Sequence, residues 1–439
     1  MTSRTARRSV REFVRSVADG EIHPASIPSI VLSARDRNPG PVFTSISRER
    51  IEAQVRELEK GGGGRGALRG LPISVKDLMD VAGECTGCGS RRVMESAAPE
   101  ARDAAFVERW REAGALLVGK THLNEHAYGI TGENPWLGDC TIPGDPGALA
   151  GGSSSGAAAS VLEGSSWIGL GTDTGGSLRV PASLCGLVSL RAPGWFGDHR
   201  GTRPLAPGFD TLGWIQRWLG DVEFVARAVI HDPVGDLHER GVPTRLGWMT
   251  GSLLDGCDPA VFGAFDSLRG RMQQAGLAVD VVPADGLSHA ADVFAMLQAR
   301  EAFGVHQLEL ASDPESFSAP VRGRLEWGGA LGEAELRHAA AERARMVSQL
   351  DGLLEGGRVL MLPAAPMTRL LAGADHSRTR RQILTLTTPA SLGVYPVLTI
   401  PDELLGGRVR VGFQFIAARG AEWRLVELST RLAESHPTP

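Results

Sequence analysis

The chain of 439 residues is long enough for two or three ordinary domains or for one large α/β unit. Apolar residues make up 42% and charged residues 22%, as in typical globular proteins, and the formal net charge of −5 gives no electrostatic reason to expect nucleic acid or an anionic membrane as a partner. The first twenty residues carry five arginines but no uninterrupted apolar segment, and no run approaches the roughly 18 apolar residues of a membrane span. We therefore expect a cytoplasmic protein without a signal peptide.

The predicted elements begin with an amphipathic helix over about 10–17 and a second helix over about 47–60. Glycines at 61–64 then form a link that contains a G-x-G-x-x-G pattern. A dinucleotide fingerprint must follow a strand, whereas this pattern follows a helix, so we do not expect a nucleotide there. A buried strand over 71–75 ends at Lys76.

The middle of the chain alternates helix and strand. Asp103 is a suitable N-cap for a helix that Gly114 ends, and a strand over 115–118 follows. A helix of small residues over 156–162 leads to a strand over 167–171.

The second half continues the alternation with different sequence. Asp258 and Pro259 predict a helix start. The further predicted elements are a strand over 277–282, a long helix over 332–354, a strand over 359–362, a half-exposed strand with Val409, Val411, Phe413 and Phe415 on one face, and a last helix over 421–432. This order predicts an α/β fold with a mixed, mostly parallel central sheet that helices cover on both faces, as one domain over residues 1–439.

Lysine is rare in this chain. It occupies three of the 46 basic positions, Lys60, Lys76 and Lys120. Arginine replaces lysine in ion pairs, but it does not deprotonate at accessible pH and cannot act as a base. Each lysine is therefore a candidate for a role that needs a neutral amine.

The five cysteines are too few and too scattered for a disulfide framework. Cys85 and Cys88 form a C-x-x-C without a second pair or a nearby histidine, so we expect ordinary loop or core cysteines, and no metal or other cofactor. GSSSG at 152–156 matches G-x-S-x-G, which would make Ser154 a nucleophile at an elbow. That motif requires a strand leading straight into it, whereas here a loop rich in glycine and proline precedes it.

Three further stretches occur in order: LPISVKDLMDVAG at 71–83, GGSSSGAAAS at 151–160 and GLGTDTGGSLRVPASLCGLVSL at 169–190. Together they resemble the amidase signature family, most clearly from about 67 to 193, with a variable, pocket-forming region at about 240–380. The resemblance implies that Ser177 is an acylated nucleophile and that Lys76 is the base. It also implies that Ser153 follows a cis peptide bond and bridges Ser177 and Lys76 as a proton relay. A lysine amine is a usable base only when burial or a neighbouring positive charge lowers its pKa, and the inner end of an apolar strand provides such burial.

The same resemblance gives the glycines after the third strand a role. The backbone N–H groups of Thr174, Gly175, Gly176 and Ser177 are expected to stabilise the oxyanion of the reaction. We expect Asp173 and Arg179 to support this loop or pair with each other, in preference to contacting substrate. Lys120 is expected to be structural, and Asp77 either orients the site or caps the following turn.

The resemblance thus predicts an enzyme, an amidohydrolase that cleaves a small-molecule carboxylic amide through an acyl-serine intermediate. Two alternatives remain open: a glutaminase-type A subunit of a tRNA-dependent amidotransferase, and a catalytically silent binding protein on the same fold. A homodimer is also an open alternative. The chain departs from many relatives at Asn124-Glu125-His126, where Asp-Glu-Phe is frequent.

Overall fold

The computed structural model describes residues 8–61, 66–230 and 245–436. Most of the glycine link predicted at 61–64 therefore lies outside the described residues. Within them, eleven strands form one sheet, in the spatial order β1 (Phe43–Ile46), β3 (Leu116–Thr121), β2 (Pro72–Lys76), β6 (Ile168–Thr172), β8 (Leu212–Gln216), β7 (Val188–Arg191), β12 (Val397–Pro401), β13 (Gly412–Ile416), β11 (Val359–Pro363), β9 (Arg245–Thr250) and β10 (Ala278–Pro283).

The sheet is mixed, as predicted. Strands β3, β2 and β6 form one parallel block and β11, β9 and β10 form another, whereas the strands between the blocks pair antiparallel. Every residue of β2, β3 and β6 is buried, because a parallel strand covered on both faces has no side open to water. A two-stranded hairpin, β4 (Thr141–Ile142) and β5 (Asp145–Leu149), stands apart from this sheet.

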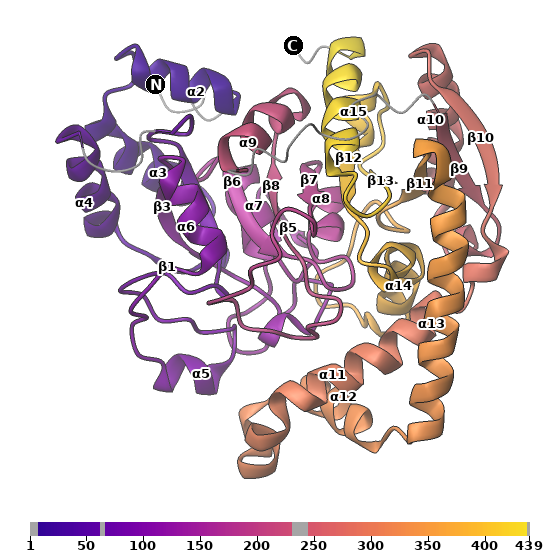
Figure 1. Ribbon diagram of the computed structural model, residues 1–439. Coiled ribbons are helices and arrows are strands. Elements are labelled where there is room, and N and C mark those ends of the chain that lie inside the picture. Colours follow the sequence, from indigo (N-terminus) through magenta and orange to yellow (C-terminus); the bar gives the residue numbers. More distant parts are fainter. Residues whose placement is uncertain (1–7, 62–65, 231–244, 437–439) are drawn as a thin grey trace.

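Helices surround the sheet (Figure 1). Those of the first half are α2 (Val10–Ala18), α3 (Ile27–Arg35), α4 (Arg48–Glu59), α5 (Arg91–Ser96), α6 (Ala105–Glu112), α7 (Ser155–Glu163), α8 (Arg179–Cys185) and α9 (Val222–Val229). Those of the second half are α10 (Pro259–Gln274), α11 (Ala290–Ser312), α12 (Ala319–Ala330), α13 (Glu333–Leu354), α14 (Ser377–Leu392) and α15 (Glu422–Ser435). The α11–α12 pair, orange in Figure 1, extends away from the sheet. None of the described helices is long and apolar enough to cross a membrane.

Two local predictions were wrong. The N-cap of α6 is Ala104, and the Asp103 carboxylate instead accepts a hydrogen bond from the N–H of Ala82 and pairs with Arg111. The predicted half-exposed strand at 409–415 is the fully buried β13, because it lies between β12 and β11 with both faces covered.

Small residues let α7 approach the sheet closely. A Cβ atom at Gly169 of β6 would collide with the backbone of Ala157, and one at Gly171 would lie 2.7 Å from the Ser154 hydroxyl oxygen. The SGAAAS segment of α7 is buried throughout. The start of this helix is thereby held against the ends of β2 and β6, where the predicted site residues lie.

Candidate active site

Lys76 is the last residue of β2, and its side chain is fully buried. Its Nζ atom donates hydrogen bonds to Ser153 Oγ at 2.8 Å and to Thr172 Oγ1 at 2.7 Å. Burial lowers the pKa of Lys76 to about 7, against the opposing charges of Asp173 and Asp210. A substantial fraction of the amine is therefore neutral near neutral pH.

Ser153 follows a cis peptide bond from Gly152, as the resemblance implied. The N–H of Gly152 donates to the carbonyl of Ile130 at 2.9 Å, which anchors this segment to the loop after β3. Ser154, the candidate elbow nucleophile, donates its hydroxyl to the Thr172 carbonyl and is buried. The hydroxyl of Ser154 is therefore engaged with the backbone of β6 and makes no hydrogen bond to Lys76.

Ser177 lies in the turn between β6 and α8 and is buried. Its carbonyl accepts a hydrogen bond from the N–H of Ser154 at 3.2 Å, so the two serine-bearing segments lie side by side. At Gly176, φ is +127°, a value that an L side chain rarely adopts, and a Cβ there would lie 3.0 Å from Thr387. The close approach of α14 thus requires glycine at this position.

The backbone N–H groups of this turn divide into two sets. Gly176 donates to Asp173 Oδ1 at 2.8 Å, so its N–H is already used in this structure and does not fit the predicted oxyanion role. Among the described residues, the N–H groups of Thr174, Gly175 and Ser177 have no acceptor. These three remain the candidate oxyanion donors.

Asp173 and Arg179 form a fully buried, bidentate ion pair, with Nε–Oδ2 at 3.0 Å and Nη2–Oδ1 at 2.8 Å. The predicted pairing of these two residues is therefore present. Burial acts to raise the pKa of Asp173, but the charge and hydrogen bonds of Arg179 outweigh it, and the pKa is held below its usual range. Arg179 also donates to the Thr387 carbonyl and to Gln414, which ties the turn to α14 and β13.

Lys120 has the structural environment predicted for it. Its Nζ atom lies 2.9 Å from Asp77 Oδ1 and also donates to the Cys85 carbonyl and the Thr86 hydroxyl. Burial raises the pKa of Asp77, against the opposing charge of Lys120. Asp77 also accepts the N–H of Gly87, so it braces the turn after β2. Cys85 is exposed and Cys88 is buried, and both are free thiols.

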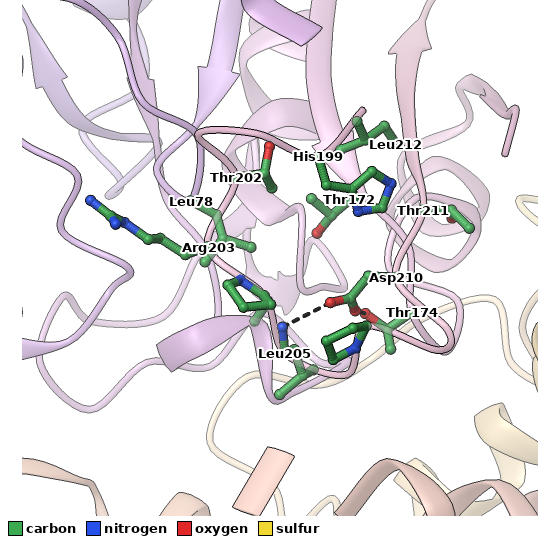
Figure 2. Close-up of a pocket in the computed structure, with 13 residues that line it drawn as sticks. Leu78, Thr172, Thr174, His199, Thr202, Arg203, Leu205, Asp210, Thr211 and Leu212 are labelled. Carbon is green, nitrogen blue, oxygen red and sulfur yellow. Dashed lines mark hydrogen bonds between the residues drawn. The ribbon is translucent and has the colours of Figure 1, made fainter. Parts of the chain in front are cut away.

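Two site residues were missed from the sequence. Thr172 contacts Lys76 because β2 and β6 are adjacent parallel strands whose ends meet at one edge of the sheet. Asp210 accepts the hydroxyl of Thr174 at 2.6 Å, and burial raises its pKa. Both line a cavity of about 90 Å³ beside the proposed nucleophile turn (Figure 2). Strand adjacency could have suggested Thr172, but no motif marks Asp210.

Comparison with known proteins gives consistent results. The Amidase family model matches residues 42–426. The chain is 31% identical over 401 residues to 2-amino-5-chloromuconic acid deaminase of Comamonas testosteroni, covering 86% of this chain and 84% of the relative. It is 28% identical to the glutamyl-tRNA(Gln) amidotransferase A subunit of Anaeromyxobacter sp. (strain K), covering 92% of this chain and 90% of the relative.

A solved structure described as a crystal structure of amidase superposes with a TM-score of 0.85 at 32% identity, over 98% of this chain and 100% of that one. Family model, relatives and fold therefore agree over nearly the whole length. The chain belongs to the amidase family of hydrolases that act on carbon–nitrogen bonds.

Proposed function

We propose that the chain hydrolyses a small carboxylic amide through an acyl-Ser177 intermediate, with Lys76 as the base and Ser153 as a proton relay. The observation that carries this proposal is the hydrogen bond from the fully buried Lys76 Nζ to Ser153 Oγ, next to the turn that bears Ser177. A buried amine whose partners are hydroxyl groups is a base that can work near neutral pH.

In the first half-reaction, Ser177 Oγ attacks the amide carbon and gives its proton to Ser153, which passes its own proton to Lys76. The carbonyl oxygen becomes an oxyanion, and the N–H groups of Thr174, Gly175 and Ser177 stabilise it. Each such donor is worth on the order of 2.7–4 kcal/mol. When the C–N bond breaks, the relay returns the proton from Lys76 to the departing nitrogen.

In the second half-reaction, water attacks the acyl carbon and the same relay removes its proton. Ser177 leaves as the alkoxide and recovers a proton from the relay, which releases the carboxylic acid. Asp173 and Arg179 act as positioning residues here, because Asp173 accepts the N–H of Gly176 within the nucleophile turn. None of these proton transfers requires a group from outside the chain.

The test is ammonia or amine release from a panel of aliphatic, aryl and amino-acid amides, together with labelling of Ser177 by a fluorophosphonate. Ser177→Ala should abolish both, and Ser153→Ala should slow both strongly, with water as a poor substitute relay. Substantial turnover by Ser177→Ala would refute the proposal. Absence of labelling in the wild type would favour a catalytically silent protein.

The family also bears on the binding partner and the cellular location of the protein. We propose a small-molecule substrate and a cytoplasmic site of action. A glutaminase subunit with this chemistry would instead pass ammonia to a companion protein, and turnover of glutamine stimulated by charged tRNA would favour that function. The molar mass from light scattering tests for a homodimer.

A further inference from the structure

A large pocket of about 730 Å³ lies between the loop that follows β3 and the helices α12 and α14. Tyr128 of the loop, Arg324 of α12 and Arg380 of α14 are among its lining residues. Both arginines fall in or at the end of the region at 240–380, for which sequence analysis makes no specific prediction.

Helix α14 connects this pocket to the proposed catalytic turn. Its Thr387 hydroxyl donates to the Gly175 carbonyl at 2.6 Å, and a Cβ on Gly175 would lie 3.3 Å from Leu384. Arg380 lies four positions before Leu384 and seven before Thr387, on the same face of the helix. At 1.5 Å per residue, Arg380 therefore lies roughly 10 Å along the helix axis from Thr387.

The loop after β3 makes a second connection. Tyr128 is two residues before Ile130, whose carbonyl accepts the N–H of Gly152, the residue before Ser153. The pocket is thus bounded by two segments that each contact the proposed catalytic residues or their immediate neighbours. The pocket therefore adjoins the segments that carry the proposed catalytic residues, although Ser177 is not among its lining residues.

The two arginines share the Tyr128 ring. The guanidinium carbons of Arg324 and Arg380 lie 4.7 Å and 5.9 Å from its centroid. Arg324 donates to the Tyr128 carbonyl through Nη2, whereas its buried Nε has no acceptor. In the described part of the chain, no carboxylate lies within 4.0 Å of either guanidinium.

Four acidic residues line the pocket, Glu125, Glu133, Asp139 and Asp375, and two of them accept hydrogen bonds from neutral donors. Glu125 accepts the indole N–H of Trp136 at 2.7 Å and hydrogen bonds from Ser318. Asp375 accepts the N–H of Ser377 at 2.9 Å. Burial, and then the charge of Arg380, lower the pKa of Arg324 to about 9. The two cations are therefore held near each other with no carboxylate at ion-pair distance, although the charge of Glu125 acts on Arg324 from further away, and a bound anion would stabilise this arrangement.

We propose that Arg324 and Arg380 bind a carboxylate of the substrate, so that the substrate class is amides that carry a carboxylate remote from the scissile bond. Guanidinium groups bind carboxylates in a planar, bidentate geometry, and Tyr128 fixes the orientation of both. The proposal rests on the proposed hydrolysis at Ser177 and adds the substrate class.

The experiment compares each α,ω-dicarboxylic acid monoamide, from succinamate to suberamate, with the corresponding neutral diamide. The wild type should show a higher kcat/KM for at least one monoamide than for its diamide. Arg380→Gln should lower the monoamide-to-diamide ratio of kcat/KM about 10- to 150-fold, the value expected for a charged hydrogen bond. Arg380→Lys should recover part of this ratio.

The matched control is Arg381→Gln, on the same helix. Arg381 is exposed and pairs with Asp292, so its substitution should leave the ratio unchanged. A ratio near one in the wild type, or an equal ratio in wild type and Arg380→Gln, overturns the carboxylate site.

A second measurement separates this inference from the proposed function. An uncharged fluorophosphonate labels Ser177, and adipate, but not the neutral adipamide, should slow that labelling in the wild type and fail to slow it in Arg380→Gln. Absence of labelling counts against the catalytic proposal. Labelling that adipate and adipamide slow equally, or that neither slows, counts against the carboxylate site alone.

Discussion

Lys76 should make the reactivity of Ser177 depend steeply on pH. Its side chain is fully buried and has two hydroxyl partners, and burial lowers its pKa to about 7. A lysine with the ordinary pKa of about 10.4 is neutral in roughly one molecule in 2,500 at pH 7, whereas a pKa of about 7 makes about half of the molecules neutral. Burial therefore increases the population of the active base roughly 1,000-fold at this pH.

The assay is the second-order rate constant for labelling of Ser177 by an uncharged fluorophosphonate, between about pH 5 and pH 9. Because the neutral amine is the active form, the rate should rise about tenfold per pH unit below about pH 7 and level off above it. Lys76→Arg, which stays protonated throughout, should label slowly at every pH. A rate that still rises about tenfold per pH unit between pH 8 and pH 9, or labelling of Lys76→Arg at the wild-type rate, would refute the role of Lys76.

Two further predictions concern the nucleophile turn. Asp173→Asn leaves its buried guanidinium partners without a counter-charge and should lower the free energy of unfolding, measured by urea titration, by about 3–5 kcal/mol. The control is Asp145→Asn, which breaks the solvent-accessible ion pair with Arg369 and should leave the urea midpoint of unfolding nearly unchanged. Gly176→Ala should abolish labelling of Ser177, since its new Cβ would lie 3.0 Å from Thr387. Gly144 also has a positive φ, +87°, but open space around it. Gly144→Ala should therefore label normally, and equal labelling of the two alanine variants would contradict the steric argument.

The elements predicted best from the sequence are those whose local pattern and environment agree. Strands β2, β3 and β6 are short, mostly apolar runs, as expected of strands that are buried on both faces of a sheet. A glycine or lysine near each run helps to mark the strand in the sequence. Helices α11 and α14 were not predicted. Their apolar residues are spread around the helix and do not gather on one face. In α14 neighbouring elements cover most of them, whereas Val305 and Leu308 of α11 are exposed.

The sequence predicted only those site residues that belong to a recognisable motif. Lys76, Ser153 and Ser177 lie within motifs, so a single sequence was enough to propose them. Arg324 and Arg380 are two among many arginines, and only the fold shows that they approach the same ring without a carboxylate partner. The use of the Gly176 N–H by Asp173 likewise depends on a side-chain geometry that no spacing reveals.

The hydrogen bonds of Arg179 have a consequence for how the enzyme is made. This residue lies directly after the proposed nucleophile turn, yet three of its acceptors, Thr387, Ser391 and Gln414, belong to the last eighth of the chain. During synthesis on the ribosome, the turn therefore lacks its final support until the C-terminal strand has emerged. A nascent or truncated chain that stops before Thr387 should carry Ser177 without an ordered oxyanion site, so that reactivity appears only after the segment up to Gln414 has been added.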